Sequence, residues 1–284
     1  MISAFKYHSY GNDFLVVSSS DLSEEYYSEF AKAICHPHQG VGGDGCVYIA
    51  KSTEGEFHLR IFNRDGSEAG MSGNGMRCGC AHLHHRELVD QPEVCMHTVS
   101  GLKIYTLLEE RECCWQYRCQ MGVPVFEASA VPFQAEQPND EVMDYPLSVA
   151  GEIVHIAALS VGNPQCILFG EELPDEREFR RLGRALEVHS RFPERTNVAF
   201  AVVRDPHQLE IKIWERGVGP THSSGTGCCG AAVAAIRSGK ARSPVTVQTE
   251  TGSQLVEWES GKQVILTGNS EFIAKLTFYW RQDV

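Results

Sequence analysis

Ser72-Gly73-Asn74-Gly75 and Ser224-Gly225-Thr226-Gly227 are two copies of one motif, Ser-Gly-x-Gly, placed in the two halves of the chain. A run of small residues follows each copy, beginning at Met76 and at Cys228. Glycines before small residues are typical of a helix that begins abruptly, packs closely and leaves its first N–H groups without helical partners. The helix dipole favours an anion at such an end. Two such ends facing each other would make a site for a small anionic substrate.

The repetition extends upstream of the serine motif in both halves, which is typical of a duplicated unit. Gly11-Asn12-Asp13-Phe14 and Gly162-Asn163-Pro164-Gln165 each precede an apolar run. An amphipathic pattern then predicts a helix over about 21–35 in the first half and 175–190 in the second. In the second of these, Phe179, Leu182 and Leu186 share one face.

A strand-like segment leads into each serine motif, over 59–63 in the first half and 209–215 in the second. Asn63 and Glu215 end these segments at equivalent places. The sequence therefore predicts an α+β protein of two similar domains, with the substrate site between them. The first domain is predicted over residues 1–121 joined by 265–284, and the second over 122–264. Further strands are expected over 94–99, 102–109, 113–121, 245–258 and 273–280, and loop and edge structure over 127–146.

Composition limits the function classes. The chain has 284 residues, 42% of them hydrophobic, and a formal net charge of −12, which argues against a general nucleic-acid binder. No apolar run approaches the roughly 20 residues of a membrane span, and the N-terminus has no signal-peptide core. The 11 cysteines are an odd number and are read as reduced thiols. We therefore expect a cytoplasmic protein without a membrane or nucleic-acid partner.

Cysteines and histidines cluster after the first serine motif, at Cys78, Cys80, His82, His84 and His85. Their spacing fits no compact tetrahedral zinc set, because on a helix they point in several directions. We expect small residues inside, histidines at the surface and no metal.

Several polar residues at the ends of predicted strands are candidates for substrate contacts. A lone Gly-Asn is usually a hairpin turn, but its recurrence favours a role for Asn12 and Asn163, whose amides suit a zwitterion. Asn63 ends a strand in a polar turn that a hairpin alone would also explain. A Glu-Arg pair is most often a surface ion pair; at this strand end Glu215 would instead hold an ammonium and Arg216 a carboxylate.

These motifs resemble the diaminopimelate epimerase family over nearly the whole chain. The resemblance rests on the segments 11–14, 40–45, 62–68, 72–78, 162–164, 196–198, 215–217 and 224–227. It implies two domains, each a curled and mostly antiparallel sheet around a central helix, with the substrate in the cleft between them. It also implies an epimerase that uses neither pyridoxal phosphate nor a metal, and a homodimer. Its substrate would be a small amino acid or dicarboxylate, LL-diaminopimelate being converted to the meso isomer for lysine and peptidoglycan precursors.

In the family, two cysteines at the starts of the central helices act as base and acid on opposite faces of the α-carbon. In this sequence those positions are Ser72 and Ser224. The resemblance assigns substrate contacts to Asn12, Asn63, Gly73, Asn74, Asn163, Asn197, Glu215, Arg216, Gly225 and Thr226.

The sequence departs from the family pattern at the positions that would carry out the reaction. Both motif cysteines are serines, the residue after Gly-Asn-Pro is Gln165 where the family usually has histidine, and Pro220 replaces a usual glutamate. A thiol has a reference pKa of about 8.5, whereas a serine hydroxyl is a far weaker acid and needs an activating partner. Cys78 and Cys228 lie further into their helices and do not stand in for the serines.

Three hypotheses follow. The first is an amino-acid epimerase that acts through Ser72 and Ser224, either natural or made by exchanging cysteines to trap substrate; the changes at Gln165 and Pro220 argue against a simple double substitution. The second is a related isomerase or dehydratase that begins with the same α-proton loss but needs one base and one acid. The third is a catalytically silent protein that binds a small ligand.

Overall fold

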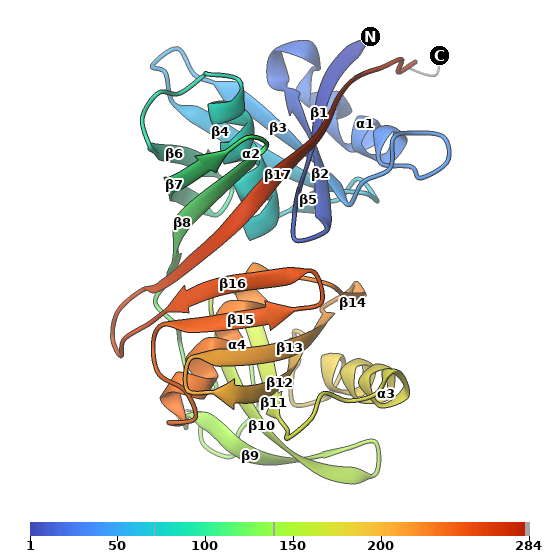
Figure 1. Cartoon of the computed structure of the whole chain (residues 1–284). Helices are drawn as coiled ribbons and strands as arrows, with labels where there is room; N and C mark the ends of the chain where they lie inside the picture. Colours follow the sequence, from blue (N-terminus) through green and yellow to red (C-terminus); the bar gives the residue numbers. More distant parts are fainter. Residues whose placement is uncertain (71, 139, 282–284) are drawn as a thin grey trace. The chain divides into compact units, whose positions relative to one another are not determined.

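The computed structural model describes residues 1–70, 72–138 and 140–281, which form two compact units. Unit 1 comprises residues 1–119 with the C-terminal segment from 268, and unit 2 comprises residues 120–267. The units divide at 119/120 and 267/268, where the sequence places the divisions at 121/122 and 264/265. Figure 1 shows the chain passing from one unit to the other twice. Within the described residues, no helix is both long and apolar enough to cross a membrane.

The strands of unit 1 pair in a closed ring. In order around the ring they are β1, β2, β3, β4, β6, β7, β8 and β17, and β17 pairs again with β1. The short strand β5 pairs with β4 outside this ring. The elements are β1 (Ile2–Ser9), β2 (Asn12–Ser18), α1 (Tyr27–Ile34), β3 (Gly45–Lys51), β4 (Phe57–Asn63), β5 (Glu68–Ala69), α2 (Gly73–His85), β6 (Glu93–Thr98), β7 (Gly101–Arg111), β8 (Cys114–Gly122) and β17 (Val264–Phe278).

Unit 2 repeats this order of elements. It contains β9 (Val142–Val149), β10 (Glu152–Ser160), β11 (Pro164–Phe169), α3 (Glu176–Glu187), β12 (Asn197–Asp205), β13 (Gln208–Glu215), β14 (Gly219–Thr221), α4 (Gly225–Arg237), β15 (Val245–Thr249) and β16 (Gly252–Glu257). β16 then pairs with the beginning of β17.

The pairing directions confirm the duplication. In unit 1 the pairs β2–β3 and β4–β6 are parallel, and the corresponding pairs β11–β12 and β13–β15 in unit 2 are parallel too. The ladders β1–β2, β3–β4 and β6–β7 are antiparallel, as are β10–β11, β12–β13 and β15–β16. The predicted fold of two similar, mostly antiparallel α+β domains is therefore confirmed.

Each sheet packs around one central helix, α2 in unit 1 and α4 in unit 2. Ten of the 13 residues are buried in both helices, which requires small side chains where strands approach closely. A Cβ added at Gly79 would come within 2.5 Å of the Leu59 side chain, and one at Gly230 within 2.9 Å of Gln165. The run of small residues after each serine motif thus serves close packing.

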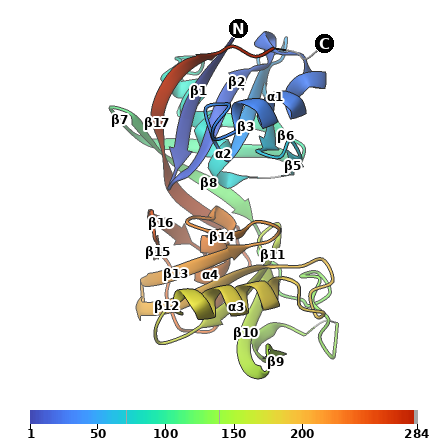
Figure 2. The same ribbon diagram turned by 90° about the vertical axis from the view of Figure 1, so that its right-hand side faces the viewer.

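The outer helices α1 and α3 cover the other face of each sheet. In unit 1, Phe30 is buried and Tyr27 stacks on Tyr48 with ring centroids 3.8 Å apart. In unit 2, the predicted face of Phe179, Leu182 and Leu186 is buried in the apolar core. Figure 2 shows α3 lying along the β12 and β13 side of unit 2.

Several elements differ from the prediction. The helix expected from residue 21 begins at Tyr27, after two short 3₁₀ turns at Ser19–Asp21 and Glu24–Tyr26. At the first turn an α-helix does not form because Ser18 Oγ accepts a hydrogen bond from Ser20 N–H, and this local bond competes with helical hydrogen bonds. The final strand begins at Val264 rather than at 273. The segment expected as loop and edge contains β9, which tolerates Pro146 because β10 is its one ladder partner among the named strands of the described chain.

The expectation of surface histidines after the first serine motif is wrong. His82 is buried, and His84 and His85 are half-buried. Tyr7 Oη lies 3.3 Å from His82 Nδ1 and 2.8 Å from His85 Nδ1, so the rings belong to a packed polar cluster at the end of α2. Burial lowers the pKa of His82 to about 3, with the nearby Arg86 acting in the same direction.

Candidate active site

Both motif serines cap the central helices in the same way. Ser72 has φ −143° and ψ 111°, and its Oγ accepts a hydrogen bond from Gly75 N–H at 3.1 Å. Ser224 has φ −143° and ψ 123°, and its Oγ accepts from Gly227 N–H at 3.2 Å. The predicted abrupt helix starts are confirmed. Each hydroxyl therefore lies at the positive end of a helix dipole, where negative charge on its oxygen is stabilised.

The backbone beside Ser72 is open to a ligand. A Cβ added at Gly73 would meet no atom of the described residues within 4 Å, and Ser72 and Gly73 are both half-buried. In unit 2, Ser224 and Thr226 are likewise half-buried, whereas Gly225 is buried. Amide groups in the first turn of a helix lack helical acceptors, so each start supplies N–H donors for an oxyanion or a carboxylate.

Around Ser72, unit 1 brings two of the predicted asparagines together. Asn74 Nδ2 donates to Asn12 Oδ1 at 3.1 Å, and Asn12 Nδ2 donates to Asp44 Oδ2 at 2.7 Å. The fully buried Arg77 donates through Nη2 to Asn74 Oδ1 and through Nε to Ser9 Oγ. The asparagine side chains are therefore fixed by a charged network inside the unit.

Asn63 lies apart from that network. It is the last residue of β4, it is exposed, and its Nδ2 donates to Ser67 Oγ at 3.0 Å. Its register partner is Gly45, which in turn pairs with Phe14 on β2. The loop at Asp44 thus separates Asn63 from Asn12.

Around Ser224, unit 2 forms a different set of contacts. Asn163 Nδ2 donates to Thr226 Oγ1 at 3.4 Å, and Thr226 Oγ1 lies 3.4 Å from Ser224 Oγ. Gln165 Nε2 donates to Asn163 Oδ1 at 2.7 Å. Gln165 is buried with 1% of its surface exposed and packs against Gly230.

The Glu215-Arg216 loop is held from two sides. Arg216 N–H donates to Asn197 Oδ1 at 3.0 Å, and Gly217 N–H donates to Glu187 Oε1 at 2.8 Å. The buried Asn197 also donates through Nδ2 to Pro164 O, so both ends of its amide have partners within the fold. The Arg216 side chain is exposed, and its Nη1 donates to Glu194 O. This loop is therefore pre-shaped while the guanidinium stays accessible.

Three residues that hold the candidate site in place were not predicted from the sequence: Asp44, Arg77 and Glu187. Arg77 is a charged residue within a run of small residues, and this pattern could have identified it, because a guanidinium buried there needs several hydrogen-bond acceptors. Glu187 directly follows the apolar face of α3 and accepts from Trp214 Nε1 at 2.7 Å as well as from Gly217. No local pattern marks such a residue, since its partners lie far along the chain.

The neighbouring thiols are poorly placed as bases. Cys78 and Cys228 are fully buried. Burial raises the pKa of Cys78 to about 12, although Ser270 Oγ donates to its sulfur at 3.4 Å. Gln254 Nε2 lies 3.4 Å from Cys228 Sγ. The described residues bring no three His, Cys, Asp or Glu side chains together as a metal-binding group.

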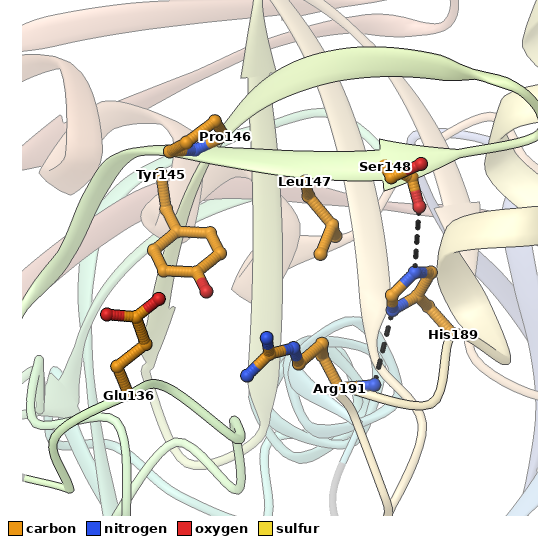
Figure 3. A pocket seen from close by; sticks show the side chains of 7 residues that line it. All are labelled: Glu136, Tyr145, Pro146, Leu147, Ser148, His189 and Arg191. Carbon is orange, nitrogen blue, oxygen red and sulfur yellow. Dashed lines mark hydrogen bonds between the residues drawn. The ribbon is translucent and has the colours of Figure 1, made fainter.

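A surface hollow in unit 2 lies away from these residues. It has a volume of about 570 Å³ and contains none of the predicted site residues. Figure 3 shows Tyr145 and Arg191 pointing into it, and His189 bonded to Ser148 at its edge.

Comparisons with solved structures agree with the fold. A probable proline racemase from Agrobacterium radiobacter K84, solved with bound carbonate, superposes with a TM-score of 0.70 at 14% identity, covering 99% of this chain and 94% of that one. This likeness places the chain in a fold shared with racemases.

Relatives found by sequence share a higher percentage of identical residues with this chain. A sequence model of the Diaminopimelate epimerase family matches residues 4–127 and 157–273. The diaminopimelate epimerase of Pelotomaculum thermopropionicum is 38% identical over 268 residues, 94% of this chain and 95% of that protein. That of Desulfitobacterium hafniense is 36% identical over 275 residues, 95% of both. The chain belongs to the diaminopimelate epimerase family and is an isomerase of the amino-acid epimerase class.

Proposed function

We propose that this protein converts LL-diaminopimelate to the meso isomer, with Ser72 and Ser224 at the acid and base positions. The observation that carries the proposal is that both serines cap the central helices with the same geometry, each with its oxygen held by a first-turn amide. We also propose that the protein acts as a cytoplasmic homodimer that supplies lysine and peptidoglycan precursors.

The chemistry needs two groups on opposite faces of one α-carbon. One oxygen takes the α-proton, the electron pair moves into the carboxylate as an enediolate, and the other hydroxyl returns a proton to the far face. First-turn amides at residues 73, 74, 225 and 226 would stabilise the enediolate, as donors of an oxyanion hole do. In this proposal Asn12, Asn63 and Asn163 contact the zwitterionic ends of the substrate, and Asn197 shapes the loop that carries Glu215 and Arg216.

A hydrogen-exchange experiment tests the activity. In heavy water, the purified protein should exchange the α-proton of LL- or meso-diaminopimelate and interconvert the isomers, slowly, because a serine hydroxyl is a poor base. Proton NMR follows the exchange. Loss of a β-substituent or a new alkene signal from a suitable substrate would instead favour the related isomerase or dehydratase.

The exposed guanidinium of Arg216 provides a binding test. Arg216→Ala should weaken diaminopimelate binding by about 2–3 kcal/mol, because one charge-assisted pair to a carboxylate is lost. Isothermal titration calorimetry measures the change. Arg181→Ala is the matched control, since it removes an exposed guanidinium on α3 that pairs with Glu152 of β10. Equal affinities for the two variants would show that Arg216 does not bind the ligand.

A second candidate function is a catalytically silent ligand-binding protein. It is favoured by the hydrogen bonds at the serines, because the described residues place no titratable side chain within bonding distance of either hydroxyl. Binding of diaminopimelate without any exchange in heavy water would select this function.

A further inference from the structure

A chain of side-chain hydrogen bonds runs from the interior of unit 2 to Ser224. It begins at Gln165 Nε2, passes through Asn163 and Thr226, and ends at Ser224 Oγ. The inner link is 2.7 Å long and the two outer links are 3.4 Å. Four residues from two elements, the start of β11 and the start of α4, are thereby joined in one line.

The chain has a direction. Gln165 donates to Asn163 Oδ1, which leaves Asn163 Nδ2 to donate to Thr226 Oγ1. Between the neutral hydroxyls of Thr226 and Ser224 either oxygen can be the donor. Once the group at position 224 has lost its proton it can only accept, so Thr226 O–H is then the donor. In that charged state the Ser224 oxygen receives two donors, Thr226 O–H and Gly227 N–H. Donors to an oxygen or sulfur favour its charged form and lower its pKa.

Gln165, the first donor of the chain, is buried and well packed. Gln165 Cγ lies 2.9 Å from the position a Cβ would take at Gly230, so the side chain occupies space that only a glycine leaves open. Gln165 Oε1 has no hydrogen-bond partner among the described residues. The amide is thus held through its donor end, and that donor is the one that orients Asn163.

Unit 1 is arranged in the opposite sense. There Asn74 donates to Asn12, and Asn12 donates to the carboxylate of Asp44, so the chain leads away from the helix start. The residue equivalent to Gln165 is Phe14, which packs on Gly75 and has no polar group. Of the described residues, Gly75 provides the one hydrogen bond at Ser72 Oγ.

We propose that Gln165 and Thr226 are positioning residues that direct donors at Ser224, and that Ser224 is therefore the member of the pair that carries negative charge more readily. The proposal deepens the proposed function, on which it rests: the Ser224 half-site removes the α-proton and the Ser72 half-site returns one in the favoured direction. The two faces of the enzyme are then chemically unequal although their backbones match.

A thiol pKa measurement tests this without relying on turnover. Ser224→Cys places a titratable probe at the end of the chain, and its alkylation rate with iodoacetamide is followed against pH by mass spectrometry of the peptide. In that background Thr226→Val should raise the thiol pKa by about one unit, the effect of losing one hydrogen bond to an anion. Thr226→Ser, which keeps the hydroxyl, should leave it unchanged. The parent protein corrects for alkylation of Cys228 and Cys229 in the same peptide.

Gln165→Met tests the origin of the direction. It should raise the same thiol pKa, and it should add nothing once Thr226→Val is present, because both changes break one chain. The probe Ser72→Cys in unit 1 should not respond to either change. An unchanged thiol pKa in Thr226→Val, or equal shifts at both probes, would overturn the proposal. If the protein proves inactive on diaminopimelate, these pKa values still decide the matter, so the two proposals fail separately.

Discussion

Replacing both Ser72 and Ser224 by cysteine is expected to raise the rate of α-proton exchange from diaminopimelate by about 10²- to 10⁴-fold, the usual contribution of a well-matched acid–base group. The backbone is already suitable, because both positions are helix caps with nearly the same φ and ψ. A thiolate at a helix N-terminus is stabilised by the dipole and by the amide that now bonds the serine oxygen. Proton NMR in heavy water measures the gain.

Single variants and a neighbouring control sharpen this experiment. Ser224→Cys alone should accelerate removal of the proton from one isomer more than from the other, since one face gains a base. Ser223→Cys makes the same chemical change one residue away, at a buried hydroxyl that accepts from Gln254 and does not cap the helix. It should have no effect on exchange. Absence of exchange with every diaminopimelate isomer, before and after the double change, would exclude diaminopimelate as the substrate.

Glu187→Gln is expected to lower the free energy of unfolding by about 2–3 kcal/mol. The buried carboxylate accepts from Trp214 Nε1 and from Gly217 N–H, and a glutamine of the same shape has one acceptor for these two donors. The other donor would face an NH₂ group, which costs about as much as losing a hydrogen bond to a charged partner. Urea denaturation followed by tryptophan fluorescence measures the loss.

The same substitution should also loosen the loop that carries Arg216, because Gly217 loses its anchor. We therefore expect weaker ligand binding together with the lower stability. Glu178→Gln is the matched control, since Glu178 lies on the exposed face of the same helix and its side chain is not needed by the loop. Equal unfolding midpoints for the two variants would show that Glu187 does not hold the loop.

The fold could be predicted from the sequence because the same motifs occur in both halves of the chain. The two serine motifs, the two Gly-Asn turns and the apolar face of α3 each signalled an element through local pattern, and the strand pairings confirm the duplicated unit. The strands β3, β10 and β12 were not recognised, because their buried residues follow one another without the alternation that marks a half-buried strand.

The candidate site was readable only where its residues recur. Ser72 and Ser224 stand at equivalent helix starts, and Asn63 and Glu215 end equivalent strands. The partners that orient the site could not be predicted, because Glu187 bonds residues 27 and 30 positions away and Arg77 bonds Ser9 across 68. Such pairings follow from the three-dimensional fold and not from local spacing.

The course of β17 has a consequence for biosynthesis on the ribosome. Its first residues complete the pairing of β16, whereas its last residues, up to Phe278, pair with β1, which lies more than 260 positions earlier in the sequence. Most of unit 1 is thus translated before unit 2, but its ring of strands cannot close until β17 has been translated. In the nascent chain β1 and β8 remain open edges, which are the kind of surface that recruits chaperones or pairs with other chains. Of the two units, the one whose synthesis begins earlier therefore completes its sheet later.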